Sequence, residues 1–340
     1  MSDTISYGEI SPRVGVYAVL KLLENALPGM VMQRFGQVTT LPKKRGDTVK
    51  WRRYERFAAA LAPLAEGVSP TAQPLRARDY TVSLKQYGAW CRITDKCVDM
   101  HEDGPLDVAI RQCSDQFKET EERLTIECLK GSAVRYYANG VAGRANVANA
   151  VSRGDFRRVA RGFQRANVAK INRMVMPTPN ANTHGIPDTY IAVCHTDLDS
   201  DIRNCTGFIS YAEYGDPKNK VDGEIGAIEN FRIITSNLVE PYLASGAVGT
   251  TNLSNGVAPS SSAAADVYPI ICLGQDAYGV VRLQGVNAAH VCVLQPDTPR
   301  GGDPLGQRGS VGWKFWHAAK ILFEDACAIL EVACTANPGA

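Results

Sequence analysis

The sequence predicts an α+β fold, in which helices and strands occupy different stretches of the chain. Apolar residues recur with helical spacing over residues 104–131, whereas residues 189–285 alternate short apolar runs with turns. The chain has 340 residues, of which 45% are hydrophobic and 21% are charged. This length and composition are sufficient for a folded core and for about two domains.

Residues 1–46 are predicted to form an N-terminal arm. Their short apolar stretches are broken by Pro28 and Gly29, and the segment ends in the basic run LPKKRG. Such a short amphipathic stretch must pack on another surface to stay ordered, because short isolated helices are marginal in water.

Two segments rich in β-branched and aromatic residues, 47–54 and 78–95, are predicted to pair as an extended hairpin. Their connection carries Pro63, Pro70 and Pro74 and is too long for a compact turn. A two-stranded ribbon is marginally stable by itself in water. We therefore expect the hairpin to lie against another surface.

A long amphipathic helix is predicted from Gly104 to about Gly131. At ~1.5 Å per residue it would span about 40 Å. Its other faces carry many carboxylates, among them Glu119, Glu121 and Glu122. The apolar stripe has helical spacing and comprises Leu106, Ile110, Cys113, Phe117, Leu124 and Cys128.

A second helix is predicted to begin at Ser152, because Asp155 follows three residues later in a pattern typical of a capping box. Its apolar positions continue toward Ile171. Four arginines recur every four residues along one slowly turning face: Arg153, Arg157, Arg161 and Arg165. This face is either solvated or a surface that binds phosphates or an acidic neighbour.

Beyond a linker rich in helix breakers, residues 176–188, the chain is predicted to form short strands and turns. Residues 243–266 are rich in Gly, Ser and Ala, which is typical of a mobile surface loop. The strands are expected at TYIAVCH, FRIITSN, VYPIICLG and VVRLQG.

Charge is distributed in blocks, although the formal net charge is only +2. Residues 1–60 carry ten Lys and Arg against five Asp and Glu, residues 99–127 carry three against nine, and residues 153–173 carry seven against one. Such blocks are typical either of solvated faces or of surfaces that steer copies of a chain toward each other.

The ten cysteines contain no C-x-x-C pair and no clustering of the kind that zinc sites need, so we expect buried thiols and no metal. The N-terminal residues show no signal-peptide pattern, and no apolar run reaches ~18 residues. A soluble protein of a reducing compartment, without a membrane partner, is therefore expected.

The most enzyme-like stretch is CHTDLDSD, which begins at Cys194 and His195. Neighbouring residues of a strand point to opposite faces, so these two side chains cannot share a proton directly. Thr196 or Asp197 is expected instead to cap a short helix that runs to about Asn204. No phosphate-loop, dinucleotide, zinc-protease or serine-hydrolase motif occurs, so we expect no enzyme and no cofactor. Modules that recognise nucleic-acid sequence are also absent, so DNA contact would be nonspecific.

Four segments occur in an order similar to that of a known family. They are RGDTVKWRRY with the following LAEGVSP, then YGDPKNKVDGEIGAIENFRIITSN, then VYPIICLGQDAYGVVRLQG, and finally DPLGQRGSVGWKFWHAAKIL. From about residue 45 to the end, their order and spacing resemble the major capsid proteins of tailed bacteriophages, in the branch of the N4-like podovirus coat protein. One departure is the run from His195 to Asp197, which reads His-Thr-Asp where the family often has His-Pro-Asp.

The resemblance implies the shell fold shared by tailed phages and herpesviruses. Residues 311–321 alternate with period two, so Trp313 and Phe315 are expected to pack toward the long helix and Trp316 to face a neighbouring subunit. The implied parts are an N-terminal arm (1–46), an extended hairpin loop (47–95), a peripheral domain with a spine helix (96–149), an axial domain (150–305, with part of the chain returning to the peripheral sheet) and C-terminal strands of the peripheral domain (306–340).

The resemblance further implies a structural protein that assembles into hexamers and pentamers of an icosahedral head around double-stranded DNA. Its implied partners are copies of itself, scaffold, portal and cementing proteins, and the packaged DNA. Its implied location is the virion capsid, assembled in the host bacterial cytoplasm. We expect Arg52, Arg53 and Arg56 of one copy to face Glu119, Glu121 and Glu122 of its neighbour.

Two other functions remain open at this point. A nanocompartment shell, similar to the encapsulins, would share the fold but enclose enzyme cargo. A cytosolic oligomeric hydrolase would use Cys194 or His195. Size-exclusion chromatography separates a shell from a hydrolase, because a shell is a megadalton particle.

Overall fold

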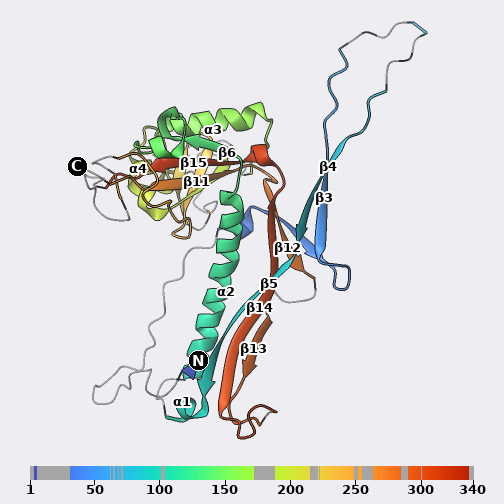
Figure 1. Cartoon of the computed structure of the whole chain (residues 1–340). Helices are drawn as coiled ribbons and strands as arrows, with labels where there is room; N and C mark the ends of the chain where they lie inside the picture. Colours follow the sequence, from blue (N-terminus) through green and yellow to red (C-terminus); the bar gives the residue numbers. More distant parts are fainter. Residues whose placement is uncertain are drawn as a thin grey trace.

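The computed structural model describes residues 4–5, 31–61, 63, 66–67, 69, 72–100, 104–171, 188–214, 221, 223–248, 252–254, 263–284, 290–299 and 301–336. Figure 1 shows a compact part at one end of the long helix α2 and an elongated part in which α2 runs beside a sheet. A two-stranded ribbon projects away from both parts.

The compact part is built on a seven-stranded sheet in the order β6-β15-β11-β7-β10-β9-β8. Strand β7 pairs parallel with β10 and antiparallel with β11. Three of the predicted strands, TYIAVCH, FRIITSN and VYPIICLG, are confirmed in this sheet. The strands are Val134–Tyr137 (β6), Tyr190–Cys194 (β7), Phe208–Ser210 (β8), Glu224–Ile228 (β9), Phe231–Thr235 (β10), Val267–Leu273 (β11) and Cys327–Ala333 (β15).

Helix α3, Arg153–Arg165, begins as predicted and ends earlier than expected. The backbone N–H and the hydroxyl of Ser152 donate hydrogen bonds to Asp155 Oδ2 at 3.0 and 2.7 Å, which confirms the capping box. The expected continuation toward Ile171 is wrong, because Asn167 adopts a left-handed conformation with φ 51° and so ends the helix.

Aromatic side chains fill the space between α3 and the sheet. The ring of Phe163 lies 5.0 Å from Tyr190 and 6.1 Å from Phe231, and Phe156 lies 5.7 Å from Phe231. All four are fully buried, and each contributes ~2–3 kcal/mol before entropy losses. Strand β7 is apolar throughout because both of its faces are covered.

The elongated part contains a six-stranded sheet in the order β1-β5-β14-β12-β2, with β13 also paired to β14. The long strand β14 pairs with β5 from Arg308↔Thr94 to His317↔Lys85 and then with β12. The strands are Thr4–Ile5 (β1), Gln37–Leu41 (β2), Lys85–Thr94 (β5), Tyr278–Leu283 (β12), His290–Leu294 (β13) and Arg308–Ile321 (β14).

The predicted long helix is confirmed as α2, Pro105–Lys130. Trp313 and Phe315 of β14 pack on it as expected, with their rings 5.8 and 4.9 Å from that of Phe117. The indole N–H of Trp313 also donates to Gln116 Oε1 at 3.0 Å. Aromatic contacts therefore attach the helix to the long sheet.

The ribbon consists of β3, Thr48–Tyr54, and β4, Ala77–Ser83, which pair antiparallel from end to end. The hairpin is thus confirmed, but the expectation of one continuous strand over residues 78–95 is wrong. The chain breaks at Leu84, whose side chain is buried and whose N–H donates to Asp47 O at 2.8 Å. After this break β5 leaves the ribbon and joins the long sheet.

Strand pairing also differs from the segment boundaries expected from the sequence. Strands β12 and β13 pair with β14 in the elongated part, and they lie in the segment 150–305, part of which was expected to return to the peripheral sheet. Strand β15, expected among the C-terminal strands of the peripheral domain, pairs instead with β11 and β6 in the compact part. The chain therefore passes between the two parts repeatedly, and neither part is one continuous segment.

The remaining elements are short. Helix α4 is Asp199–Arg203 and α1 is Asp95–Met100. The 3-10 turns are Met32–Arg34, Ala138–Gly140, Arg144–Asn146, Thr196–Leu198, Tyr211–Glu213 and Glu324–Ala326. No helix among the described residues is long and apolar enough to span a membrane.

Several predicted segments lie partly outside the described residues. These include most of the arm, residues 6–30, and most of the linker at 176–188. The described end of the arm contains β2, which pairs parallel with β12. Of the predicted loop at 243–266, residues 249–251 and 255–262 lie outside the described range.

Candidate assembly surfaces

The base of the ribbon is fixed to the body by an aromatic contact. The indole N–H of Trp51 donates to Thr39 Oγ1 at 3.2 Å. A Cβ at Gly279 would come within 2.7 Å of the Trp51 ring, so glycine is needed there to admit it. Two residue pairs further along the ribbon, the guanidinium of Arg53 lies 3.7 Å above the ring of Phe323.

The cations of the ribbon differ in how far they are paired within the chain. Arg52 Nε and Lys50 Nζ lie 2.8 and 3.1 Å from Asp79 and hold the pKa of that carboxyl well below its usual range. Arg56 is exposed and makes no ion pair with any other residue that the structure describes. Asp79 engages Arg52 and the ring of Phe323 engages Arg53, so among the three predicted ribbon arginines we select Arg56 as the one whose charge is available to another subunit.

Two grooves flank the ribbon where it leaves the body, and Arg53, Tyr80 and Phe323 line both. One has a volume of about 620 Å³, and the other about 540 Å³. The larger groove is lined by residues of both charges, namely Arg53, Glu55, Arg56, Arg78, Glu324 and Asp325, together with Tyr54, Tyr80 and Phe323.

The expectation of an acidic exposed face on α2 is wrong for two of its three residues. Glu122 is fully buried, and its Oε1 accepts hydrogen bonds from the backbone N–H groups of Val31 and Met32 at 2.7 Å each. Glu121 is also buried and accepts from Arg282 Nη2 at 2.8 Å. Of the three, Glu119 is the one that stays partly exposed, with its side chain 39% exposed and paired to Arg123 at 2.8 Å.

His317 lies beside these buried carboxylates. Its Nδ1 is 3.9 Å from Glu121 Oε1, its Nε2 is 3.4 Å from Thr125 Oγ1, and its ring also contacts Phe315. Burial, with a smaller contribution from Arg282, lowers the pKa of His317 to about 4.

A pH dependence of stability follows from His317. Because its folded pKa lies below its ordinary value of 6.5, its contribution is complete above pH 6.5 and is lost as the pH falls toward 4. We expect a loss of about 2–3 kcal/mol over this range. Denaturant unfolding of wild type and His317→Gln at pH 7 and pH 4.5 tests this, since glutamine does not titrate. Equal pH dependence in both proteins would contradict it.

Trp316 is not available in the way we expected. Its side chain is partly buried in a cluster with Leu41, Leu84, Val281 and Ala318 at the base of the ribbon. The far face of β14 is therefore partly covered by this chain's own residues at this point, and contact of the remaining Trp316 surface with a neighbouring subunit stays a prediction.

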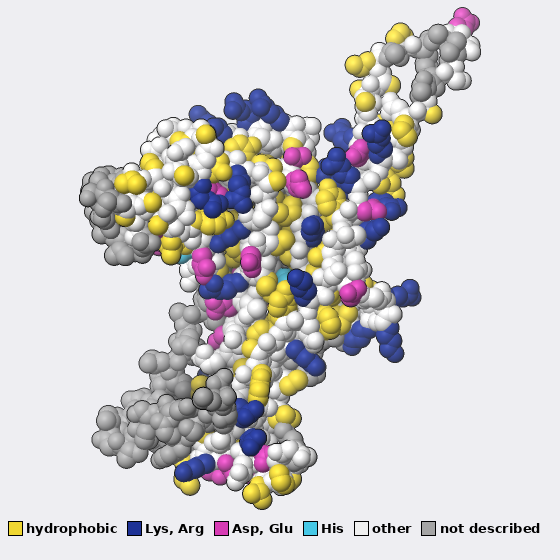
Figure 2. All heavy atoms as spheres, viewed as in Figure 1, with side chains coloured by type: hydrophobic (Ala, Val, Ile, Leu, Met, Phe, Trp, Pro, Cys, Tyr) yellow, Lys and Arg dark blue, Asp and Glu magenta, His cyan; other side chains and the backbone are white. Residues whose placement is uncertain are grey.

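The arginines of α3 divide into two pairs. Arg153 and Arg157 both bind Glu229, with Arg157 Nη2 at 2.9 Å from its Oε1. Arg161 and Arg165 are exposed and form no ion pair with another described residue. Figure 2 shows Lys and Arg side chains gathered over this end of the compact part.

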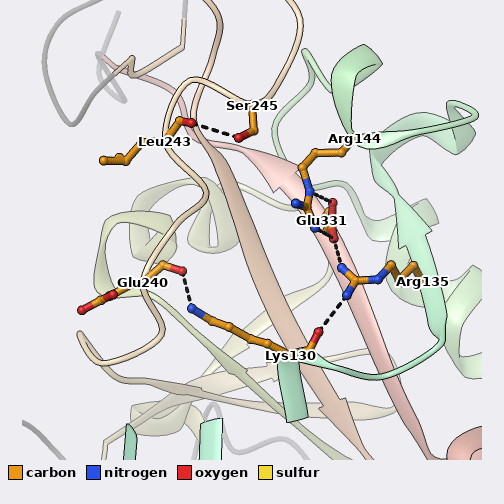
Figure 3. A network of polar contacts seen from close by, with 7 residues as sticks. All are labelled: Lys130, Arg135, Arg144, Glu240, Leu243, Ser245 and Glu331. Atoms are coloured by element: carbon orange, nitrogen blue, oxygen red, sulfur yellow. Dashed lines mark hydrogen bonds and ion pairs between the residues drawn. The ribbon is translucent and has the colours of Figure 1, made fainter. Parts of the chain in front are cut away.

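A buried ionic network lies inside the compact part. Figure 3 shows Arg135 and Arg144 pointing toward Glu331 of β15. Arg144 Nε and Nη2 each donate to the carboxylate at 2.7 Å, and Arg135 donates as well while binding Lys130 O at 2.7 Å. Glu331 is fully buried. Sequence reasoning missed it, although one carboxylate inside the apolar run CAILEVA is a visible signal.

Comparison with known proteins decides what kind of molecule carries these surfaces. The family model described as phage capsid protein matches residues 79–332. This chain belongs to the phage capsid protein family. Surfaces that could contact other copies of the chain are therefore the relevant candidate sites.

Individual relatives of this capsid protein agree with the family. The major capsid protein of Pseudomonas phage KPP21 is 23% identical over 269 residues, which cover 73% of this chain and 66% of that protein. The capsid of Ralstonia phage GP4 has a TM-score of 0.70 at 14% identity, covering 98% of this chain and 99% of that one. The cyanophage Pam1 capsid has a TM-score of 0.64 at 13% identity, covering 98% and 99%. The predicted fold, that of tailed-phage capsids, is confirmed.

The hydrolase hypothesis finds no support in the geometry of this capsid protein. Cys194 is fully buried, and burial raises the pKa of its thiol far above the ordinary value, so the reactive thiolate is suppressed. The Nδ1 of His195 accepts from Asp197 N at 3.2 Å and thereby caps the short helical segment that we had expected Thr196 or Asp197 to cap. Among the described residues, no group of His, Cys, Asp and Glu could hold a metal ion.

Proposed function

We propose that this protein is the major subunit of an icosahedral phage head and assembles into hexamers and pentamers around packaged double-stranded DNA. The observation that carries the proposal is the ribbon, whose two strands project from the body (Figure 1) and pack on it at their base, where Val49, Trp51 and Val82 join the cluster around Leu84. A ribbon of this kind is marginal alone in water, and another copy of the chain would supply the surface that covers it.

In this proposal the elongated part is the peripheral domain, with α2 as the spine helix, and the compact part is the axial domain. The ribbon with its tip, residues 48–83, is the extended loop, and the first 30 residues belong to the arm. Assembly would take place in the host bacterial cytoplasm with scaffold, portal and cementing proteins as further partners. A structural role of this kind requires no reaction and no cofactor.

We propose Arg56 as the ribbon cation that contacts a neighbouring subunit. Its partner would be an exposed carboxylate of the neighbour, and Glu119 is the predicted acidic residue on α2 that remains accessible. The exposed pair Arg161 and Arg165 would serve a different purpose, as a face for the phosphates of the packaged DNA rather than for a neighbouring subunit.

Charge reversal at Arg56 tests the contact. We expect Arg56→Glu to lower the yield of particles at least tenfold, because one contact repeated over a whole shell multiplies its effect. Arg161→Glu makes the same charge change on an exposed helix and should leave the yield unchanged. Particles are counted by negative-stain electron microscopy after expression of the full chain, and nuclease-protected DNA is measured in particles made during infection. Equal yields from the two variants would rule out Arg56 as a contact.

A further inference from the structure

Two cysteines face each other across the interface between α2 and the long sheet. Cys91 of β5 pairs in register with Val311 of β14, so both side chains point to the face that packs on α2. Cys113 of α2 lies above this row, with its Sγ 3.9 Å from Val311 O. The two side chains therefore belong to one cluster around Val311, and Cys91 adds to the effect of burial in raising the pKa of Cys113.

This pair differs from the other cysteines because its two thiols lie in one cluster and one of them is accessible to solvent. Cys194, Cys272 and Cys327 are neighbours in the compact sheet, but all three are fully buried, so no reagent reaches them in the folded chain. Cys91 is only partly buried, whereas Cys113 is buried beside it. A small oxidant can therefore modify Cys91, and the modified sulfur then lies in the same cluster as the Cys113 thiol.

We propose that Cys91 and Cys113 form a redox modification site, at which an intrachain disulfide joins α2 to β5 when the folded protein meets a small-molecule disulfide. Cellular thiols keep such a pair reduced during synthesis, and an oxidising medium favours the bond. The role of the bond in particles released from the host rests on the proposed function, but its chemistry does not.

The reaction proceeds in two exchanges with oxidised glutathione as the oxidant. The thiolate of Cys91 attacks one glutathione sulfur, forms a mixed disulfide and releases one glutathione thiolate. Cys113 then loses its proton to solvent and attacks the Cys91 sulfur, which releases the second glutathione thiolate. Two protein thiols are oxidised and one glutathione disulfide is reduced to two thiols. Burial raises the pKa of Cys113 to about 11, which assigns the first attack to Cys91.

The bond would close a loop of roughly 20 residues that contains α1 and the first turns of α2. Closing a loop of this length restricts the unfolded chain, and the apparent Tm should rise by about 5 °C. The aromatic contacts of Trp313 and Phe315 already hold this helix on the sheet, so the bond would reinforce an existing interface.

The test uses the full chain with Cys292→Ser, which removes an exposed thiol that could join two molecules. The folded protein is incubated with oxidised glutathione, denatured, alkylated and digested for mass spectrometry. We expect a linked peptide pair that contains Cys91 and Cys113, and an increase in Tm that a reductant reverses. With Cys113→Ser, Cys91 should instead stop at a glutathione adduct and the Tm should not rise.

The matched control is Cys97→Ala, because Cys97 lies in the same apolar cluster but should not take part. It should leave the linked peptide pair unchanged. A persistent glutathione adduct on Cys91 in the presence of Cys113, unmodified thiols at both positions, or a bond from Cys91 to Cys97 would each overturn the proposal. None of these readouts depends on shell formation, so they separate this site from the proposed function.

Discussion

Replacing the tip of the ribbon, residues 57–75, with Asn-Gly should abolish shell formation while leaving the subunit folded. The described apolar side chains of the tip are largely exposed, with Phe57 at 59%, Leu61 at 89% and Leu75 at 63%. They belong to none of the apolar clusters that the described residues form, so their removal should cost the subunit little stability. The backbone bond from Glu55 N to Arg76 O, 2.9 Å long, continues the register of the ribbon. In the variant, Arg56 and the new Asn-Gly form a three-residue hairpin loop between these two residues.

Two measurements decide this prediction. Thermal unfolding of the shortened subunit should stay within about 2 °C of wild type, since single surface changes away from the core have small effects. By electron microscopy, the yield of closed particles should be at least a hundredfold lower than for wild type. Normal particles from the shortened chain would refute the assembly role of the tip.

A second variant separates the side chains of the tip from its length. It keeps residues 57–75 at full length but substitutes a Gly and Ser sequence. If apolar contacts of the tip hold neighbouring subunits, this variant should fail as completely as the shortened one. If the tip acts only as a spacer, it should assemble.

The long helix could be predicted because its evidence is local. The apolar stripe that includes Cys113 and Phe117 repeats within one segment of the sequence. It therefore predicts one buried face of the helix without information about distant segments. The burial of Glu121 and Glu122, in contrast, depends on distant segments. Their carboxylates accept hydrogen bonds from Val31, Met32 and Arg282. Periodicity cannot locate a second covering segment, so two buried acids were expected on the surface.

The same distinction applies to β14. Alternation with period two placed Trp313 and Phe315 together on the face toward α2, and this was correct. It also placed Trp316 on the opposite face, but it could not tell that Leu41 and Val281 cover that face. Which face a residue occupies is local information, whereas what covers the face depends on strand pairing between distant segments.

The charge blocks of the sequence were similarly ambiguous. Arg52 meets Asp79 across the ribbon, and Arg153 and Arg157 meet Glu229 within the compact part. These arginines, which we had considered for contacts between subunits, therefore form ion pairs within their own chain. The cations without such pairs among the described residues, above all Arg56, are where assembly contacts should be sought.

Glu331→Gln should cause the largest loss of subunit stability among single substitutions of charged residues considered for this protein. The carboxylate neutralises Arg135 and Arg144, whose side chains are only 27% and 32% exposed. Removing one partner of a buried ionic group leaves uncompensated charge in a poorly solvated site. We expect a loss of about 2–4 kcal/mol in the free energy of unfolding, measured by urea denaturation of the full chain.

Glu119→Gln is the matched control, because it also removes a carboxylate from an arginine partner but on an exposed helix face. It should cost no more than about 0.5 kcal/mol. Replacing Glu331, Arg135 and Arg144 together with Met should recover part of the stability lost in Glu331→Gln, because no charge is then left unpaired. If Glu331→Gln lowers the free energy of unfolding no more than Glu119→Gln does, the prediction is wrong. Water would then solvate Arg135 and Arg144 sufficiently without the Glu331 carboxylate, and the network would not hold β15 to its neighbours.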